Sequence, residues 1–176
     1  MSLPADLLEQ AKMLTALDPR RPKQVNLRRA ISAAYYAVFH LLTSDATALF
    51  VRDDLELATR FNRAIDHKDI LKASRNFAAG KLPKILPRND DILTLPRKLI
   101  QVAEAVAGLQ EARHESDYNL SRRFSRNEAI GFVNTADSAF KAWAEVKQSD
   151  AARLYLSCFL LWNVWDKPPR GRSEDG

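Results

Sequence analysis

Apolar residues recur every three or four positions along most of the chain, which is the spacing of an α-helix with one buried face. The clearest run of this kind comprises Ile92, Leu95, Leu99, Val102, Val106 and Leu109. Proline suits the first turn of a helix, so we expect regular helix to begin near Pro96. No segment shows the strict alternation of a β-strand. The pattern therefore predicts an all-α protein.

Four helices are expected before the chain's last third. They cover roughly residues 4–17, residues 24–50, a segment from about residue 53 to Gly80, and the segment that begins near Pro96. The third of these should bend at Asp66–His67, where Asp66 can cap a new helical stretch with Asp69 in the supporting third position. A basic, proline-rich connector, residues 81–90, closes the first half of the chain. The expected architecture is an up-and-down bundle of five to six helices.

The last helical region begins with a capping-box signature, Ser125 with Glu128. Its apolar stripe continues in phase as far as Leu161, and one unbroken helix over residues 126–165 would be about 60 Å long. We therefore expect either a break near Gln148–Asp150 or an arm that packs on a partner. Leu154–Trp165 is apolar around most of its circumference, which favours a subunit interface or a cap over the bundle. We assign residues 1–147 to the bundle, residues 148–165 to an extension of the same domain, and residues 166–176 to a disordered tail.

Two charged residues continue the stripe that ends at Leu109. One step of four residues reaches Arg113, and a second reaches Asp117. If the helix persists, the two face the interior as a pair, because an unpartnered buried guanidinium costs several kcal/mol. If the helix frays first, they form an exposed pair that contributes little.

A second polar stripe lies on the helix predicted over residues 24–50. Arg29, Tyr36 and His40 follow one another at helical spacing, opposite the stripe that runs from Leu27 to Leu41. His40 alone would be interpreted as a hydrogen-bonded core histidine. Combined with the pair described above, it suggests a shared polar cluster of Arg29, Tyr36, His40, Arg113, Asp117 and Tyr118.

These motifs resemble the HEPN superfamily of small helical bundles. The similar pieces are YYAVFH at residues 35–40, His67 at the start of its helix, and Arg113 followed by Asp117 and Tyr118, and the resemblance covers roughly residues 5–147. It implies a dimeric bundle from a prokaryotic defence or toxin–antitoxin system that acts as a metal-independent ribonuclease or binds nucleotides and RNA.

The sequence departs from the ribonucleases of that superfamily at one point. They place a histidine after the arginine with four to six residues between the two, and at those positions this chain has Tyr118, Asn119 and Leu120. We therefore assign no catalytic residue and lean towards a protein that is not an enzyme. If the chain is active, His40 would serve as base and Arg113, paired with Asp117, would stabilise the phosphorane.

The formal net charge of +5 permits an anionic partner. Three cationic stretches could follow a phosphate backbone: residues 20–23, residues 81–88 and residues 122–126. We select as candidate nucleic-acid contacts Arg20, Arg21, Lys23, Arg122, Arg123 and Arg126. The alternative interpretation is scattered charge facing solvent.

Other chemistries have little support in the sequence. The histidines and the single cysteine, Cys158, have no metal-ligand spacing, so neither a metal nor a cofactor is expected, and Cys158 is predicted to lie in the core. The chain has neither a signal peptide pattern nor a run of about 20 apolar residues, which points to the cytoplasm and away from membranes.

The leading hypothesis is a HEPN-like bundle, non-catalytic or catalytically altered, that associates with nucleic acid or a protein partner. The expected partners are a second copy of the chain, RNA or a nucleotide, and a protein such as a small nucleotidyltransferase. The alternatives are a metal-independent endoribonuclease that uses His40 and Arg113, and a purely structural interaction module.

Overall fold

The computed structural model describes residues 2–83, 94–165 and 167. Within these residues the chain forms seven α-helices and no β-strand. The helices are α1 (Leu3–Ala16), α2 (Gln24–Phe50), α3 (Leu55–Ala64), α4 (His67–Ala78), α5 (Arg97–Tyr118), α6 (Arg126–Val146) and α7 (Asp150–Trp165). The all-α class predicted from the apolar spacing is confirmed.

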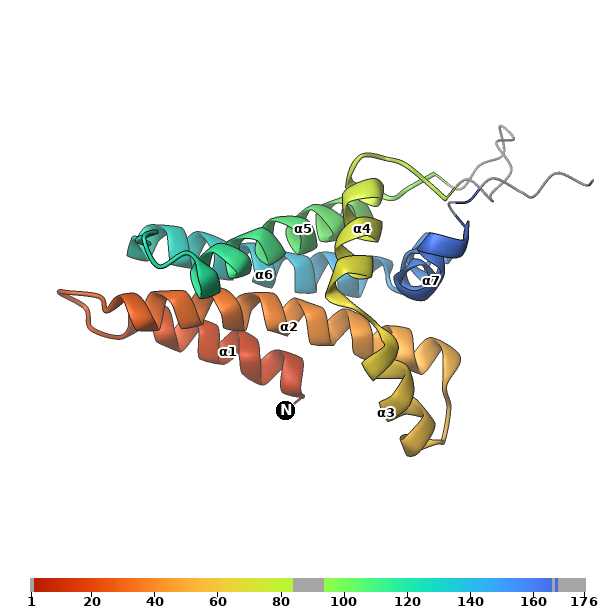
Figure 1. The fold of residues 1–176 in the computed structure, drawn as a ribbon, viewed down its shortest axis with the longest axis horizontal. Coiled ribbons are helices and arrows are strands. Elements are labelled where there is room, and N and C mark those ends of the chain that lie inside the picture. The colour runs from red at the N-terminus through yellow and green to blue at the C-terminus, as the bar shows by residue number, and fades with distance from the viewer. Residues whose placement is uncertain (1, 84–93, 166, 168–176) are drawn as a thin grey trace, which may run out of the picture.

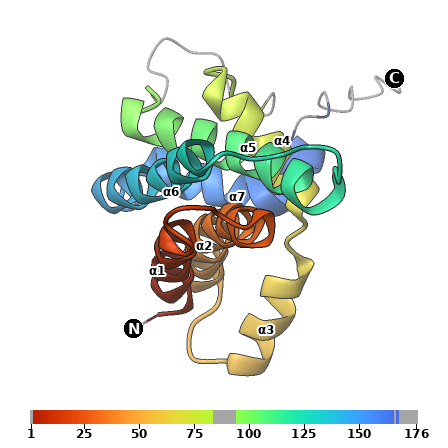
Figure 2. The same ribbon diagram turned by 90° about the vertical axis from the view of Figure 1, so that its left-hand side faces the viewer.

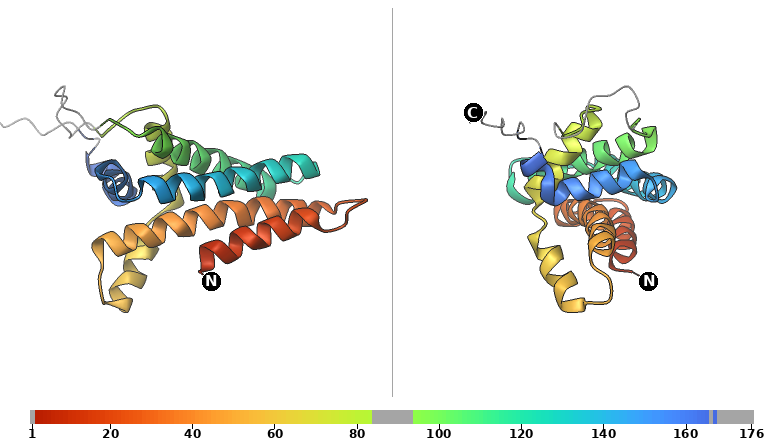
Figure 3. Two further views of the ribbon diagram at one scale, coloured as in Figure 1. Left: turned by 180° about the vertical axis from the view of Figure 1, so that it is seen from behind. Right: turned by 90° about the vertical axis from the view of Figure 1, so that its right-hand side faces the viewer.

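Helix α2 is the central element of the bundle. It contacts α1, α3, α5, α6 and α7, and Figures 1 and 3 show α1 below it and the pair of α5 and α6 above it. Its sequence explains this position, because apolar and small residues surround most of its circumference, and residues 30–35 are all buried. The shorter helices α3 and α4 run across the long ones (Figure 1).

Two breaks raise the helix number above the five to six that we predicted. Ile65 and Asp66 separate α3 from α4, and the Asp66 carboxylate caps α4 by accepting a hydrogen bond from the Lys68 amide at 2.9 Å. Asp69 does not complete a capping box as predicted. Its carboxylate instead accepts a hydrogen bond from Asn163 at 2.8 Å, because α7 lies beside α4.

The second break separates α6 from α7 and falls close to the predicted position. Helix α6 begins with the predicted capping box of Ser125 and Glu128 and ends at Val146. The Ser149 hydroxyl then accepts a hydrogen bond from the Ala152 amide at 3.1 Å, in the first turn of α7. The chain therefore turns at this point, and no 60 Å arm forms.

Helix α7 packs on its own bundle, as the cap that was one of the two predicted alternatives. Tyr155, Phe159 and Trp162 are buried, and the Tyr155 hydroxyl lies 2.6 Å from the Ser74 hydroxyl of α4. Phe77 of α4 packs on Tyr155 with ring centroids 5.0 Å apart. Residues 148–165 thus share the core of the bundle.

Helix α3 differs from the other helices in having no buried residue. Leu55 is 84% exposed, and Phe61 contacts Phe50 at the end of α2. Figure 2 shows α3 projecting from the side of the bundle.

None of the helices in the described ranges is both long and apolar enough to span a membrane. The predicted disordered tail, apart from Lys167, lies outside the described residues, and so does Ile92 of the predicted α5 stripe.

Candidate functional site

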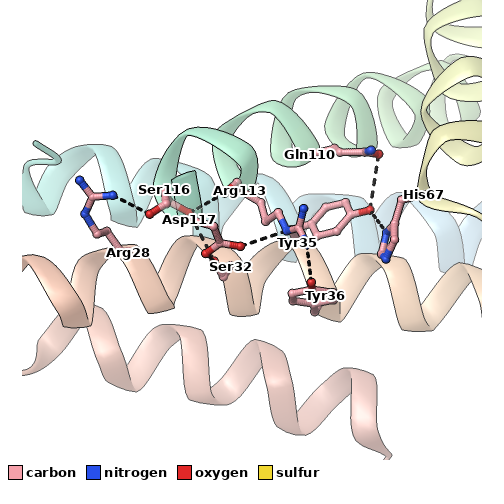
Figure 4. A network of polar contacts seen from close by, with 9 residues as sticks. All are labelled: Arg28, Ser32, Tyr35, Tyr36, His67, Gln110, Arg113, Ser116 and Asp117. Carbon is pink, nitrogen blue, oxygen red and sulfur yellow. Dashed lines mark hydrogen bonds and ion pairs between the residues drawn. The ribbon is translucent and has the colours of Figure 1, made fainter. Parts of the chain in front are cut away.

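Polar side chains of α2 and α5 form two sets of hydrogen bonds and ion pairs, one of which also reaches α4 (Figure 4), and the two sets meet where the Arg113 guanidinium lies over the Tyr35 ring. Arg28 near the start of α2 contacts Ser116 near the end of α5, while Tyr35 further along α2 contacts Gln110, so the two helices run in opposite directions. We call the two sets together the α2–α5 polar network. Its members are Arg28, Ser32, Tyr35, Tyr36, His67, Gln110, Arg113, Ser116 and Asp117.

Arg113 lies at the centre of this network. Its side chain is 19% exposed, its Nη2 donates a hydrogen bond to the Tyr36 hydroxyl at 2.7 Å, and its Nε lies 3.1 Å from Asp117 Oδ2. The Nε–H direction is not aligned for a hydrogen bond, so the contact with Asp117 is an ion pair. Burial lowers the pKa of Arg113, but the Tyr36 hydrogen bond and the Asp117 charge outweigh it and raise that pKa above its ordinary value. The guanidinium is therefore permanently charged.

Aromatic rings surround the same guanidinium. Its central carbon lies 5.9 Å from the ring centroid of Tyr35, 5.4 Å from that of Tyr36 and 5.8 Å from that of Tyr118. Such cation–π contacts stabilise a partly desolvated arginine. Tyr118 is 64% exposed, so the structure places it at the solvent edge of the cluster. The ring of His114 lies 5.0 Å from it.

Asp117 is held from both helices. Besides its ion pair with Arg113, its Oδ1 accepts a hydrogen bond from the Ser32 hydroxyl of α2 at 2.6 Å. The buried Ser116 hydroxyl lies 3.3 Å from that of Ser32. The helix thus persists through Asp117, and the structure brings together the arginine and the aspartate that the stripe placed one turn apart.

Arg28 takes the place in the network that we predicted for Arg29. The Arg28 guanidinium donates to the backbone carbonyls of Ser116 at 2.6 Å and of Asn119 at 3.0 Å, and also to that of Arg122. It therefore caps the C-terminus of α5, where a cation is favourable. Arg29 is exposed and has no hydrogen bond or ion pair with a described residue. At this point the residue that faces α5 is thus shifted by one position, about 100° around the helix, from the predicted one, whereas Tyr36 of the predicted stripe does contact α5 through Arg113.

His67 belongs to the network although sequence reasoning did not select it as a site residue. Its Nδ1 lies 2.7 Å from the Tyr35 hydroxyl, and its ring stacks on Phe39 with centroids 4.2 Å apart. Burial and the charge of Arg113 lower the pKa of His67 below its ordinary value. The imidazole is consequently neutral at pH 7. The only sequence signal was its place at the start of a helix after Asp66, within the resemblance described above.

The tautomer of His67 depends on where the Tyr35 proton points. Burial raises the pKa of Tyr35, so its hydroxyl carries a single proton, and this hydroxyl also lies 3.4 Å from Gln110 Oε1. When Tyr35 donates to Gln110, His67 Nδ1–H must be the donor in the shorter bond, and His67 Nε2 is then unprotonated. An unprotonated Nε2 is able to accept a proton.

His40 lies beside the network rather than within it. Its ring is half-buried and stacks on Tyr36 with centroids 6.2 Å apart, and neither imidazole nitrogen forms a hydrogen bond with any of the described residues. Burial lowers the pKa of His40. Of the two neutral imidazoles, that of His67 lies near enough to Arg113 for the guanidinium charge to lower its pKa, whereas that of His40 is connected to Arg113 only through Tyr36.

A cavity of about 440 Å³ opens between α4 and α5 next to Arg113. Among its lining residues, Arg75 and Glu111 form an ion pair at 2.7 Å, and Gln110 and Arg113 belong to the network. The network is therefore accessible from this side of the bundle.

The candidate nucleic-acid residues gather at one end of the molecule. Arg126 donates to the carbonyls of Leu17 at 3.1 Å and of Asp18 at 2.6 Å, so the segment between α5 and α6 lies against the segment between α1 and α2 (Figure 1). Gln24 reinforces the contact through two hydrogen bonds to the Phe124 backbone. We call this region the basic end and define it by Arg20, Arg21, Lys23, Arg122, Arg123 and Arg126.

The six cations of the basic end are not equivalent. Arg122 pairs with Glu128 at 2.7 Å, and Lys23 lies 3.8 Å from Asp18. Arg20, Arg21 and Arg123 are exposed and form no ion pair with any residue that the structure describes. These three are free to contact an anion. The third cationic stretch, residues 81–88, lies mostly outside the described residues.

Other candidate chemistry is limited. In the described part of the chain, no group of three His, Cys, Asp or Glu side chains is placed to hold a metal ion. Cys158 is buried in the core, and burial raises the pKa of its thiol to about 12. A thiol of this kind is not a nucleophile at neutral pH.

No protein-family model, no curated protein and no solved structure matches this chain.

Proposed function

We propose that this protein is a HEPN-like helical bundle that binds single-stranded RNA through its basic end and the neighbouring part of the α2–α5 polar network. The observation that carries the proposal is that two cationic segments, residues 20–23 and residues 122–126, lie side by side although they are about 100 residues apart in sequence. The hydrogen bond from the Phe124 amide to the Gln24 side chain joins them. Three unpaired arginines at one end of a small protein form a surface that attracts phosphates.

The network adjoins this surface and adds two features typical of RNA contacts. Arg28 links the basic end to Ser116, and Tyr118 offers an exposed ring beside the Arg113 charge. The bases of single-stranded RNA can stack on such rings, whereas the faces of bases within a duplex are covered by their neighbours. The biological setting that we propose, a prokaryotic defence or toxin–antitoxin system with a dimeric protein and a nucleotidyltransferase partner, rests on the resemblance alone.

The binding proposal is tested by fluorescence anisotropy with a labelled single-stranded RNA at several salt concentrations. We expect a variant with Arg20, Arg21 and Arg123 all changed to Gln to bind more weakly, and its slope of log affinity against log salt to be shallower by about 2. The matched control changes Arg63, Lys68 and Arg97, which are exposed elsewhere, to Gln and removes the same charge. Equal losses in the two variants, or wild-type protein that fails to bind at low salt, would contradict the proposal.

Metal-independent RNA cleavage is a second candidate, favoured by the neutral imidazole of His67 near Arg113 and by that of His40 beside Tyr36. Cleavage at a 2′-hydroxyl needs a base to remove its proton and a cation to stabilise the phosphorane. His67 Nε2 or His40 supplies the base in this proposal, and Arg113 supplies the cation.

Incubation of single-stranded RNA with the protein and a chelator tests this second candidate. Activity should be lost in Arg113→Ala and reduced in His67→Ala or His40→Ala, and retained in His114→Ala, which removes an exposed histidine from the same helix as Arg113. Cleavage that survives Arg113→Ala would exclude this site as its source.

A further inference from the structure

A second cavity, of about 270 Å³, lies near the C-terminal end of α2, away from the basic end. The last turns of α2, the α6–α7 connection and the start of α7 form its walls. Its lining residues are Asp45, Ala48, Leu49, Arg52, Lys147, Gln148, Arg153 and Leu156. Asp45 and Tyr36 are nine residues apart on α2, or about 13 Å along the helix axis, so this cavity is separate from the site described above.

Three cations from three segments line this cavity. Arg52 follows the end of α2, Lys147 follows the end of α6, and neither forms an ion pair with a residue in the described ranges. A cation after a helix C-terminus is favourable for the helix itself. Arg153 is different, because it lies in the first turn of α7, where the helix dipole disfavours a positive charge. Its Nη1 is 3.4 Å from the exposed Asp150 carboxylate, which offsets that cost only in part.

One carboxylate lines the same cavity and is fixed in position. Asp45 Oδ2 accepts a hydrogen bond from the indole Nε1 of the buried Trp143 at 2.6 Å. Asp45 Oδ1 has no hydrogen bond from the described residues and is able to accept one. Ala48, Leu49 and Leu156 supply apolar wall between the polar groups.

We propose that this cavity binds a small phosphate monoester, with the phosphate between Arg52, Lys147 and Arg153 and a hydroxyl of the organic part bonded to Asp45. A dianion matches a lining of three positive charges and one negative charge. The volume of about 270 Å³ is just below the range of about 300–1,000 Å³ for drug-sized ligands, which suits a ligand as small as a phosphorylated sugar. This inference does not depend on the proposed RNA function.

The test follows the Trp143 indole N–H resonance in nitrogen–proton correlation spectra, because this group bonds directly to Asp45. Titration of the wild-type protein with ribose 5-phosphate should shift that resonance saturably, whereas ribose should not. We expect Arg52→Gln and Lys147→Gln each to weaken binding about tenfold. Arg63→Gln, which removes an exposed cation from α3, should bind as the wild type does.

Three outcomes would overturn the proposal: no shift at millimolar ribose 5-phosphate, equal binding of ribose, or unchanged affinity in both cavity variants. The spectra themselves show whether each variant is folded, so lost binding in a folded variant supports the proposal. A short RNA with a 5′-phosphate, compared with the same RNA with a 5′-hydroxyl, distinguishes the two sources of a phosphate monoester. A shift with the phosphorylated RNA alone would overturn the small-ligand assignment.

Discussion

At the residue scale, the contacts of Arg113 decide whether its charge is tolerated where it lies. The guanidinium is mostly removed from water, and contacts with Asp117, Tyr36 and the three surrounding rings compensate for its lost hydration. A carboxylate that is 24% exposed and bonded to Ser32 is held more firmly than an exposed partner would be. The pair therefore fixes α5 against α2.

Asp117→Asn tests this fixing role. Removal of the negative charge leaves Arg113 partly buried without an anionic partner, so the free energy of unfolding should fall by about 1–3 kcal/mol, between the values for exposed and buried pairs. Urea denaturation measures the change. Glu104→Gln removes an exposed carboxylate from the same helix and should alter stability little. Equal losses in both variants would show that Asp117 acts only through net charge.

The lowered pKa of His67 predicts a pH dependence of stability. A histidine whose pKa is lower in the folded than in the unfolded chain binds fewer protons when the chain is folded. Its contribution to the free energy of unfolding is therefore fully present above the unfolded pKa of about 6.5. That contribution is lost as the pH falls through the folded pKa. His40 contributes in the same direction. Denaturation at about pH 7.5 and about pH 5.5 should show a smaller loss in His67→Gln than in the wild type. His114→Gln, which changes an exposed histidine, is the matched control. If stability falls between the two pH values as much in His67→Gln as in His114→Gln, His67 is not the source of the pH dependence.

Sequence periodicity predicted the part of the site that lies within one helix. Arg113 and Asp117 are one turn apart, so their proximity follows from helical geometry once the helix persists. The contacts between helices did not follow. A rotation of about 100° decides between Arg28 and Arg29, and only the packing of α2 on α5 fixes that rotation. Nothing local in the sequence indicated that His67 would meet Tyr35, 32 residues away.

At the element scale, the helices and most of their ends were predictable, while their packing partners were not. The Ser125–Glu128 capping box and Pro96 located the starts of α6 and α5 because these signals act through neighbouring residues. The apolar stripe on α7 predicted only that this helix is buried, and not what buries it. Whether it covers this bundle or a second molecule depends on the turn at Ser149, and α7 covers its own bundle.

Trp162→Ala measures how much α7 contributes to the bundle. Trp162 is buried and packs edge-on against Phe77, with centroids 6.4 Å apart, so its truncation should lower the free energy of unfolding by about 3–5 kcal/mol. Val164→Ala, at a position on the same helix that is 61% exposed, should cost little. A loss in Trp162→Ala no larger than in the control would mean that α7 adds little to the stability of the fold.

At the scale of the whole molecule, burial is distributed unevenly among the helices. Residues along the middle of α2 are buried on nearly every side, whereas α3 buries none of its side chains. Backbone hydrogen bonds open most readily where few apolar contacts must be broken. The bundle should therefore consist of a stable part centred on α2 and a weakly held α3.

Native-state hydrogen exchange tests this division. Amides in the middle of α2 should exchange only through global unfolding, and those of α3 should exchange through local opening at much lower free energy. Leu57→Ala, on α3, should leave exchange in α2 unchanged, since Leu57 is half-exposed. Protection of α3 equal to that of α2 would show that something else covers α3 in solution.

The central place of α2 has a consequence for synthesis on the ribosome. Three of the helices that cover residues 24–50, namely α5, α6 and α7, are translated well after them. At about 5–20 residues per second, the interval between the end of α2 and the end of α7 is on the order of ten seconds. Until α5 is made, the nascent chain carries a helix with apolar surface on both faces, shielded only by α1 and by α3, which buries none of its own side chains. Chaperone binding to the nascent chain should accordingly be strongest after α2 emerges and should end when α7 is released.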